Sequence, residues 1–348
     1  MGLRDRLATT LHRGGALELA LRARAAVRLP VLSVLTYHHV TDGAADYPFD
    51  DGVADAGPAQ FRRQLELLRR TCTPVGLDQV EAAMDGAALP PNAVLVTFDD
   101  GYRSNLTHAA PILAELGIPA VFFLATDFIT DRRLYWWEAI AYIVKHAPSR
   151  QIELHYPARM PLWLDDAAVS KLTKIVKDTR ALDIERFVDE LAFAAELPWT
   201  RELERTLCDR LIMTWDDVRA LRDLGMELGS HTRSHRVLQT VPDAELAHEL
   251  AGSREVLEAE LGEPIRAIAY PVGRPIHDEP RLPAAVAAAG YTLGFTNATG
   301  VNLLSSRRPV DRFDLRRVAT DRDLSDAMFL AQVAVPPLAY RARNRVVR

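Results

Sequence analysis

Apolar runs of strand length alternate along this chain with longer stretches in which apolar residues recur at helical spacing. The runs predict buried strands at 31–40, 93–98, 120–125, 226–230, 265–270 and 292–296, and a terminal strand is expected at 315–318. Helical spacing predicts helices at 58–70, 104–116, 214–224, 243–261 and 283–289. Strands that are apolar on both faces are typical of a parallel sheet covered by helices. The alternation therefore predicts an α/β barrel with its helices outside.

The stretch between the third and fourth predicted strands is far longer than an ordinary connection in a barrel. Helical patterning at 172–176 and 184–194 predicts that residues 129–213 form a helical insertion. It contains the aromatic residues Tyr135, Trp136, Trp137, Trp163 and Trp199. Such side chains either stack on sugar rings or fill a core, and the pattern leaves both interpretations open. An insertion after a barrel strand is also a place for a lid that shapes substrate choice.

The two ends of the chain are basic, whereas the part between them is acidic. The formal net charge is −5, yet six arginines lie in the first 30 residues and four in the last eight. Leucines at helical spacing predict a basic helical segment over 1–30, which either packs on the domain or contacts a membrane surface weakly. Residues 336–348 are expected to form a basic tail. The acidic part, 31–335, argues against a nucleic-acid surface on the domain.

The start of the chain contains no apolar run long enough for a secretory signal or a membrane span. A cytoplasmic protein is therefore expected, with possible peripheral contact to the inner membrane face through the basic ends. Cys72 and Cys208 match no disulfide or metal pattern, and are expected to be thiols in a reducing compartment.

Two adjacent carboxylates follow one of the buried strands. Asp99 and Asp100 come directly after 93–98 and are followed by Gly101, which is able to bend the chain so that both carboxylates approach one site. The C-terminal end of a parallel strand is where α/β folds usually build active sites. A solvated turn of the same composition is the alternative.

Two histidines four residues apart follow another predicted strand. His231 and His235 are close enough on a tight turn to direct nitrogen lone pairs at one cation. Two imidazoles and one carboxylate are a common ligand set for catalytic zinc, with a coordination position left for water. A divalent metal is expected, with Zn2+ as the first choice and Co2+, Ni2+ or Fe2+ as ions that accept similar ligands.

These motifs resemble those of the polysaccharide deacetylases, also called carbohydrate esterase family 4 or NodB-homology proteins. The first motif of that family is matched by Thr97-Phe98-Asp99-Asp100-Gly101, the second by His231-Thr232-Arg233-Ser234-His235, and the third, more weakly, by Tyr270-Pro271-Val272-Gly273. The resemblance extends over about 31–320 in the expected order. It implies a distorted (β/α)7 barrel and a metal-dependent hydrolase that removes N-acetyl or related acyl groups from amino sugars.

The resemblance also implies a role for each motif residue. Asp100, His231 and His235 would hold the metal, and Asp99 would be the general base for the attacking water. The backbone N–H of Val272 would donate a hydrogen bond to the oxyanion of the tetrahedral intermediate.

Two features of the family's pattern are missing from this chain. Ala269 occupies the position of an arginine in the third motif, and Arg274 is considered as its replacement. The C-terminal Leu-x-His motif, which ordinarily supplies the general acid, is also absent, and His277 is the last histidine.

A circular permutation accounts for the missing histidine. Tyr37-His38-His39-Val40 ends the first predicted strand and resembles the Tyr-His-x-Val of permuted members, in which the strand that carries the last motif has moved to the N-terminus. Permutation would make His38 the general acid at the mouth that holds Asp99. A structural histidine that caps the strand is the alternative, and His39 is less favoured because it points the opposite way.

The sequence therefore predicts a metal-dependent hydrolase that removes N-acetyl or N-formyl groups from an amino-sugar-containing glycan or glycoconjugate. Without an export signal, a lipid-linked or nucleotide-linked substrate is favoured over a finished polymer. Two alternatives stay open, because the fold does not identify the substrate. One is a carbohydrate-binding pseudoenzyme that keeps the pocket. The other is a metal-dependent amidase for a non-sugar amide.

Overall fold

The computed structural model describes residues 2–43, 47–165, 167–304 and 310–336. Seven strands of the main sheet are parallel to one another: β1 (Val31–Tyr37), β5 (Ala93–Phe98), β6 (Ala120–Leu124), β9 (Glu227–Ser230), β10 (Ala267–Ala269), β11 (Leu293–Thr299) and β13 (Leu315–Ala319). They follow one another around the sheet as β1-β5-β6-β9-β10-β11-β13, and β13 pairs with β1 again. The barrel is therefore closed, as the sequence predicted.

Closure of the barrel depends on β1, which pairs with the strands on both of its sides. Along one edge 32–37 lies beside 93–98 of β5, and along the other Leu35 and Thr36 lie beside Val318 and Ala319 of β13. The first barrel strand of the chain thus lies between the last barrel strand and the second. This is the place that a circular permutation gives to an N-terminal strand.

The predicted strands differ from the observed ones mainly at their ends. The prediction for 31–40 ran through a turn, because β1 stops at Tyr37 and β2 (His39–Val40) pairs with β3 (Ala54–Ala56) outside the barrel. The short strands β3, β4 (Thr73–Pro74) and β12 (Asn302–Leu303) were not predicted. They are only two or three residues long and exist because a neighbouring strand pairs with them, so no periodicity reveals them.

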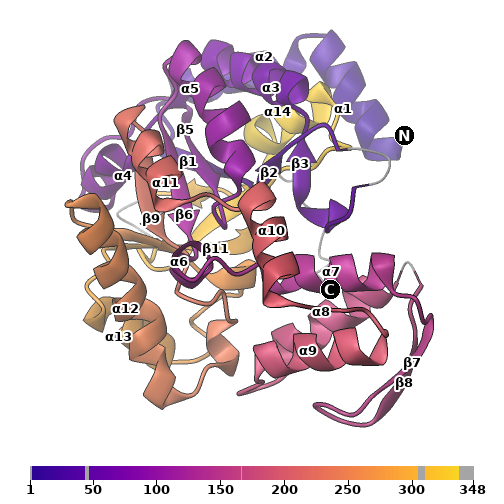
Figure 1. Ribbon diagram of the computed structural model, residues 1–348. Coiled ribbons are helices and arrows are strands. Elements are labelled where there is room, and N and C mark those ends of the chain that lie inside the picture. Colours follow the sequence, from indigo (N-terminus) through magenta and orange to yellow (C-terminus); the bar gives the residue numbers. More distant parts are fainter. Residues whose placement is uncertain (1, 44–46, 166, 305–309, 337–348) are drawn as a thin grey trace.

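Helices cover the outside of the barrel in Figure 1. These are α3 (Pro58–Thr71), α4 (Leu77–Met84), α5 (Ala110–Leu116) after a π-helical turn at Asn105–Ala109, α11 (Trp215–Asp223), α12 (Asp243–Leu261), α13 (Arg281–Ala288) and α14 (Asp326–Ala334). Thr214 and Asp217 form a capping box at the start of α11, as the sequence indicated. All five predicted helices are present, whereas neither α4 nor α14 is among the predicted ones.

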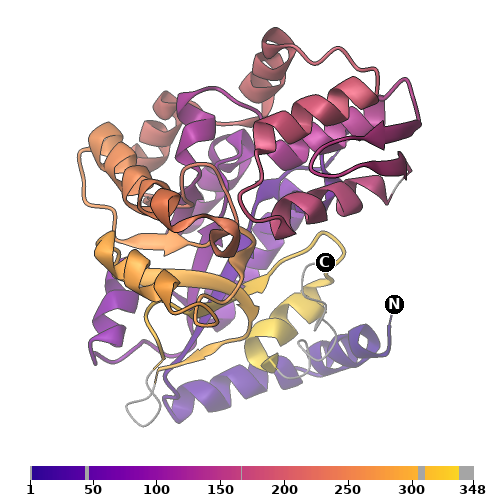
Figure 2. The same ribbon diagram turned by 90° about the horizontal axis from the view of Figure 1, so that it is seen from below.

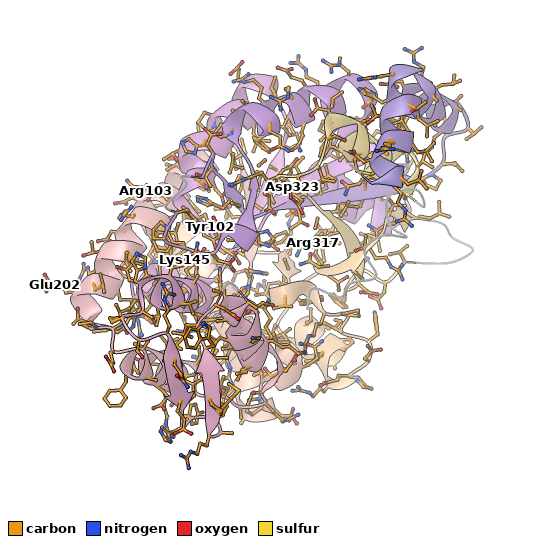
Figure 3. The ribbon with its side chains drawn as sticks, turned by 90° about the vertical axis from the view of Figure 1, so that its right-hand side faces the viewer. Tyr102, Arg103, Lys145, Glu202, Arg317 and Asp323 are labelled. Atoms are coloured by element: carbon orange, nitrogen blue, oxygen red, sulfur yellow. The ribbon has the colours of Figure 1, made fainter. Side chains whose placement is uncertain are left out.

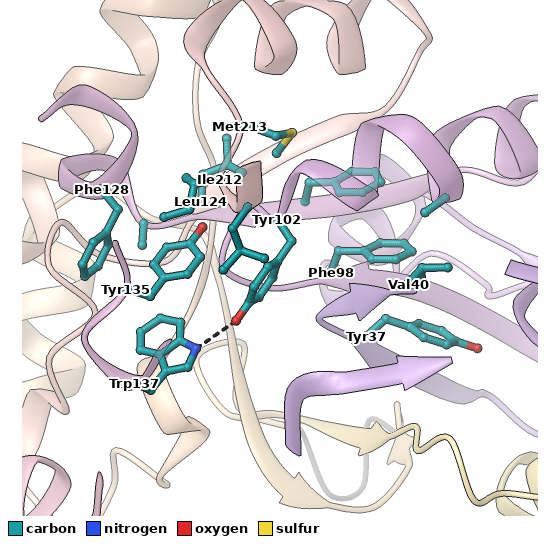
Figure 4. Packing of buried hydrophobic residues seen from close by; sticks show 14 of the residues in the cluster. Tyr37, Val40, Phe98, Tyr102, Leu124, Phe128, Tyr135, Trp137, Ile212 and Met213 are labelled. Carbon is teal, nitrogen blue, oxygen red and sulfur yellow. Dashed lines mark hydrogen bonds between the residues drawn. The ribbon is translucent and has the colours of Figure 1, made fainter. Parts of the chain in front are cut away.

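Two buried layers hold the barrel together. Leu32, Val34, Leu95, Phe123 and Phe295 belong to the cluster of strand residues that fills the barrel. A second, larger cluster lies between the barrel and its surroundings, and Figure 4 shows Tyr37, Phe98, Tyr102, Tyr135 and Trp137 within it. Side chains alternate along a strand, so the face of β5 that carries Leu95 continues through Thr97 to Asp99.

The segment after β6 and the short α6 (Thr126–Thr130) is a mainly helical insertion on one side of the barrel (Figure 1). It contains α7 (Trp136–His146), α8 (Ala168–Asp178), α9 (Ile184–Ala194), α10 (Arg201–Leu211) and a hairpin of β7 (Gln151–Leu154) and β8 (Met160–Trp163). The hairpin was not predicted. Trp136 and Trp137 are buried in the core, whereas the Trp163 side chain is exposed.

The N-terminal helices lie beside α14, the last described helix. The first 30 residues form α1 (Leu3–Arg13) and α2 (Ala16–Ala26), which pack against α14. In Figure 2 the two indigo helices run end to end along one edge of the molecule. The predicted basic tail lies, apart from Pro336, outside the described residues. Among the described helices, none is long and apolar enough to cross a membrane. Cys72 and Cys208 are free thiols.

Candidate active site

The site lies where the barrel strands end. The pairing of β1 with β5 places Tyr37 opposite Phe98, so the next residues, His38 and Asp99, emerge side by side. The N–H of Asp99 donates a hydrogen bond of 2.9 Å to the carbonyl of Tyr37. His231 follows β9, and its N–H donates to the Leu124 carbonyl at the end of β6 (2.8 Å). Residues from distant parts of the sequence thus meet at one mouth of the barrel.

Asp99 forms a buried, two-pronged ion pair with Arg317 of β13. The two guanidinium nitrogens Nη1 and Nη2 each lie 2.7 Å from a different carboxylate oxygen of Asp99. Arg317 is fixed further by a hydrogen bond from its Nε to the Thr296 carbonyl (3.2 Å). Burial alone would raise the pKa of Asp99, but the charge of Arg317 holds that pKa well below its usual range. Asp99 is therefore ionised.

Arg317 is the functional residue that the sequence analysis missed. Figure 3 labels it on β13, and its side chain is fully buried. The proposed replacement, Arg274, instead forms an ion pair with Asp178 at the end of α8. The available signal was the pair Arg316-Arg317 in an expected strand. One of two neighbouring strand residues faces the barrel interior, but the sequence alone does not say which.

Asp100 faces the same site as Asp99 because the backbone turns sharply between them. Asp100 has a positive φ of 75°, and Gly101 follows with a φ of 105°. The bend expected at Gly101 thus begins one residue earlier, in a region that few residues other than glycine adopt. Oδ1 of Asp100 lies 3.4 Å from Nε2 of His231 and 3.4 Å from Nε2 of His235.

Each histidine of the pair is oriented by the elements around it. Nδ1 of His231 donates to the Ala269 carbonyl at the end of β10 (2.7 Å), which leaves Nε2 as the lone-pair nitrogen. The carbonyl of His235 accepts a hydrogen bond from Nε1 of Trp136 (3.4 Å), and the Trp137 ring lies 4.4 Å from the imidazole. Burial lowers the pKa of His235 to about 3, so its imidazole is neutral, as a metal ligand must be.

The three side chains fit a divalent metal ion. One donor atom each from Asp100, His231 and His235 lies within 4.8 Å of the others. Oδ1 of Asp100 is buried without a hydrogen-bond partner in the described part of the chain. A buried carboxylate oxygen that lacks a hydrogen bond is costly unless a cation satisfies it. Nitrogen and oxygen donors from two imidazoles and one carboxylate suit Zn2+ and the neighbouring transition metals.

His38 lies at the same mouth and is paired with Asp55 of β3. Oδ2 of Asp55 accepts from Nδ1 of His38 at 2.9 Å and also from its backbone N–H at 2.5 Å. Burial alone would lower the pKa of His38, but Asp55 outweighs this and raises the pKa to about 9. A quarter of the side chain (25%) is exposed, so solvent reaches the imidazole. His38 is therefore protonated at neutral pH.

The other two histidines considered as acids have different surroundings. His39 is buried against the Tyr102 ring, and its Nδ1 is hydrogen-bonded to the hydroxyl of Ser104 (2.5 Å). Burial lowers the pKa of His39 to about 3. His277 is half-exposed and faces Asp311 and Asp314. Among the described contacts of these two histidines, none is to Asp99.

Val272 lies in a tight turn after β10. It has a φ of 62° and a ψ of −15°, which is rare for a β-branched residue and indicates local strain. Its backbone N–H donates to no other described residue, whereas Gly273 N–H closes the turn on the Tyr270 carbonyl (2.8 Å). A free N–H in a strained turn at the mouth is the arrangement that an oxyanion donor requires.

The sequence of this chain is similar to those of known polysaccharide deacetylases. The sequence model of the family described as "Polysaccharide deacetylase" matches residues 86–294, more than half of the chain. A poly-β-1,6-N-acetyl-D-glucosamine N-deacetylase from Escherichia coli (strain K12) is 39% identical over 90 residues, which are 25% of this chain and 13% of that protein. The chain thus matches only a small part of that relative.

Solved structures show the same fold. The deacetylase PplD from Streptococcus pyogenes, in complex with acetate, aligns with a TM-score of 0.58 at 17% identity, over 88% of this chain and 99% of that one. IcaB from Ammonifex degensii aligns with a TM-score of 0.54 at 21% identity, over 88% and 97% of the two chains. The family model matches more than half of the chain, and the barrel and the sequence motifs agree with that match. The chain therefore belongs to the polysaccharide deacetylase family.

Proposed function

We propose that this chain is a divalent-metal-dependent N-deacetylase of an amino-sugar-containing glycan or glycoconjugate. The observation that carries the proposal is the meeting of an ionised carboxylate, Asp99, with the three donors of Asp100, His231 and His235 at one barrel mouth. A hydrolase needs a base beside the water that attacks, and a pure binding protein does not. Membership of the polysaccharide deacetylase family supports the same reaction.

A divalent cation held by Asp100, His231 and His235 would lower the pKa of water and polarise the acyl carbonyl. Asp99 would take the proton from the attacking water, and Arg317 keeps that carboxylate ionised and fixed in orientation. The N–H of Val272 would donate to the acyl oxygen as its negative charge grows. The C–N bond then breaks, and the nitrogen of the leaving amine needs a proton.

His38 is the proposed source of that proton. Its pKa of about 9 keeps it protonated at neutral pH, and Asp55 fixes its ring through Nδ1. Nε2 has no hydrogen-bond partner among the described residues and is the atom that would give its proton to the amine. The amine leaves as a neutral molecule, and the carboxylic acid product carries one oxygen atom from the attacking water.

Arg317 and His38 also bear on the alternative of a binding protein. That alternative was considered because a motif arginine and a C-terminal histidine are missing from the sequence. Arg317 supplies a guanidinium to Asp99, and His38 lies beside Asp99 at the end of the neighbouring strand. Hydrolysis of a non-sugar amide would use the same residues, and no observation in the structure favours it over an amino-sugar substrate.

The finer features of the substrate and the setting are part of the proposal. The acyl group is N-acetyl or N-formyl, and the sugar is lipid-linked or nucleotide-linked. The name of the Escherichia coli relative and the acetate in the PplD complex support N-acetyl. Zn2+ is the proposed metal because two imidazoles and one carboxylate suit it. The two free thiols suit the reducing cytoplasm, the proposed location.

The test is the release of acetate and formate from a panel of N-acylated amino sugars, with free, nucleotide-linked and lipid-linked members. We expect release from at least one member, and the Asp99→Asn variant should lose that release while it keeps bound metal. The His231→Ala and His235→Ala variants should lose most of the metal. Full metal retention in both histidine variants would overturn the metal site. Acyl release only from non-sugar amides would overturn the substrate class.

A further inference from the structure

The exposed large apolar residues are concentrated in the first 30 residues. Across the described residues, nine such side chains are exposed, and five of them belong to this segment. They are Leu3 (85% exposed), Leu7 (45%), Leu19 (66%), Val27 (66%) and Leu29 (46%). Single exposed apolar residues are normal on a protein surface, but a group of five within 27 consecutive residues indicates a contact with something else.

These residues lie on the outer sides of α1 and α2. In α1, Leu3 and Leu7 are one turn apart, whereas Ala8 is buried on the other side. In α2, Leu19 faces outward, whereas Leu17 and Leu21 are buried. Because α14 packs against both helices, their outer sides both turn away from it. We call this surface, with Val27 and Leu29 just after α2, the outer face.

The exposed charges on the outer face are all positive. Arg6, Arg13, Arg22 and Arg28 are exposed between the apolar residues. The two acids of the segment are only partly exposed and have partners, since Asp5 accepts from the Ser325 hydroxyl (2.7 Å) and Glu18 pairs with His12 (2.9 Å). The rest of the domain is acidic, so this face differs from its surroundings in both polarity and charge.

We propose that the outer face binds the surface of a bilayer that contains anionic lipids. Leucines beside arginines on one helical face are typical of helices that lie in the interface, where the apolar side chains enter the acyl region and the arginines meet lipid phosphates. A second copy of this chain fits less well. A two-fold contact through this face would bring the four exposed arginines of each copy together. A nucleic acid would use the arginines but leave the leucines in water.

Hydrogen bonds attach the helices of the outer face to the barrel and to α14. Nε of Arg24 in α2 donates to Oδ1 of Asn92 (2.6 Å), the residue before β5, and Nη1 donates to the Val333 carbonyl in α14 (2.8 Å). At the other end, Asp5 of α1 is tied to Ser325, which follows β13. The helices therefore run along the flank of the barrel, between its base and its mouth. A bilayer on this face would leave the mouth open along the membrane surface, and the insertion lies on the opposite side of the molecule in Figures 1 and 2.

The proposal is tested by co-sedimentation of the full chain with vesicles. Vesicles of phosphatidylcholine with one third phosphatidylglycerol should bind the protein, and pure phosphatidylcholine vesicles should bind it at least about tenfold less. Leu3→Gln/Leu7→Gln and Arg22→Gln/Arg28→Gln should each lower binding about tenfold or more. High salt should release much of the wild-type protein, because it screens the arginines.

The matched controls carry the same changes elsewhere. Leu224→Gln/Leu303→Gln alters two exposed leucines (44% and 49%) in other parts of the fold. Arg205→Gln/Arg210→Gln removes two exposed arginines from the insertion. All variants should keep wild-type melting temperatures and wild-type activity on a water-soluble substrate. Loss of vesicle binding is therefore measured separately from loss of the proposed reaction. The proposal would be overturned if the protein did not bind anionic vesicles, or if the control variants lost as much binding as the outer-face variants. It would also be overturned if the protein formed a dimer that only the outer-face substitutions dissociate.

Discussion

The ion pair between Arg317 and Asp99 is formed by two residues that are 218 positions apart in the sequence. A carboxylate in this position would be costly without the guanidinium, because burial disfavours its charged form. Asp99 thus has a guanidinium partner although Ala269 stands at the arginine position of the third motif.

We expect Arg317→Gln to destabilise the protein by about 3–5 kcal/mol, because it leaves a buried carboxylate without its partner. Activity should fall at least about tenfold even where the variant is folded, since Asp99 loses its orientation. Denaturant unfolding and acyl release measure the two effects. Arg316→Gln is the control, because Arg316 is the exposed neighbour on the same strand. Equal effects of the two changes would contradict the role assigned to Arg317.

The pairing of His38 with Asp55 leads to a prediction about how activity depends on pH. The protonated form of His38 is the proposed acid, so kcat/KM should fall as the pH rises through about 9. Asp55→Asn removes the carboxylate that raises the pKa, and the basic limb should move toward the ordinary histidine value of about 6.5. Asp51→Asn, at an exposed carboxylate in the turn before β3, should leave the basic limb in place. An unmoved limb in Asp55→Asn would show that another group sets it.

The same pair affects stability with a defined sign. The folded-state pKa of His38, about 9, lies above the unfolded value of about 6.5. Its contribution to stability is therefore fully present below pH 6.5 or so and is lost as the pH rises through about 9.

His38→Ala should reduce turnover roughly 10²–10⁴-fold with metal content unchanged, the range typical of a lost general acid. Full activity in His38→Ala, with loss in His39→Ala or His277→Ala, would contradict the assignment.

At the scale of elements, the turn after β10 holds the Val272 N–H in place through the packing of Gly273. A Cβ at Gly273 would lie 2.3 Å from Cβ of Asn297 in β11, and Gly273 has a φ of 69°. Gly117, at the end of α5, has a similar φ of 65° but no atom within 4 Å of such a Cβ. The two glycines thus share a backbone conformation and differ in the space around them.

Substitution at these glycines separates backbone strain from packing. Gly117→Ala should cost about 1–2 kcal/mol, the ordinary penalty of a left-handed conformation, and keep activity. Gly273→Ala should cost more and should lower kcat, because the turn must shift away from Asn297 and carry Val272 with it. Thermal unfolding and kcat of both variants provide the comparison. Equal stability and equal kcat would mean that the turn is not tightly held.

The insertion is joined to the site by α7. Trp136 bonds the His235 carbonyl, and the buried carboxyl of Glu138 accepts hydrogen bonds from the Tyr102 hydroxyl and from the N–H of Asp50 (2.6 Å each). In Figure 4 the Trp137 indole donates to the Tyr102 hydroxyl at 2.8 Å. The base of the insertion is thus part of the core that supports the loop of His231 and His235. A lid function for its outer parts stays a prediction.

At the scale of the whole molecule, a metal ion bound only by the folded barrel would raise the stability of the entire domain. Its contribution is about 2.7 kcal/mol at a free concentration of 100 times the dissociation constant. Treatment with a chelator should therefore lower the melting temperature, and re-addition of Zn2+ should restore it. His231→Ala should melt at the same temperature with and without chelator. His277→Ala, at a half-exposed histidine, should keep the metal-dependent shift.

The sequence by itself determined the local chemistry and the elements. Largely apolar runs identified most of the barrel strands, and helical spacing identified the predicted outer helices, because burial imposes these periods directly on the chain. Asp99, Asp100, His231 and His235 were found because each pair lies at the end of such a strand. The sequence pattern did not assign the aromatic residues of the insertion to core or surface, and the structure divides them: Trp136 is buried and Trp163 is exposed.

Only the tertiary structure decided which distant residues meet. Closure through β1 places His38 beside Asp99, and the facing of β13 selects Arg317 rather than Arg316 for the interior. Strand pairing sets these contacts, and a shift of one residue would turn every side chain of the strand to the other face. The choice of Arg317 over Arg274 depends on that long-range pairing, because no local pattern in the chain encodes which strands become neighbours in the barrel.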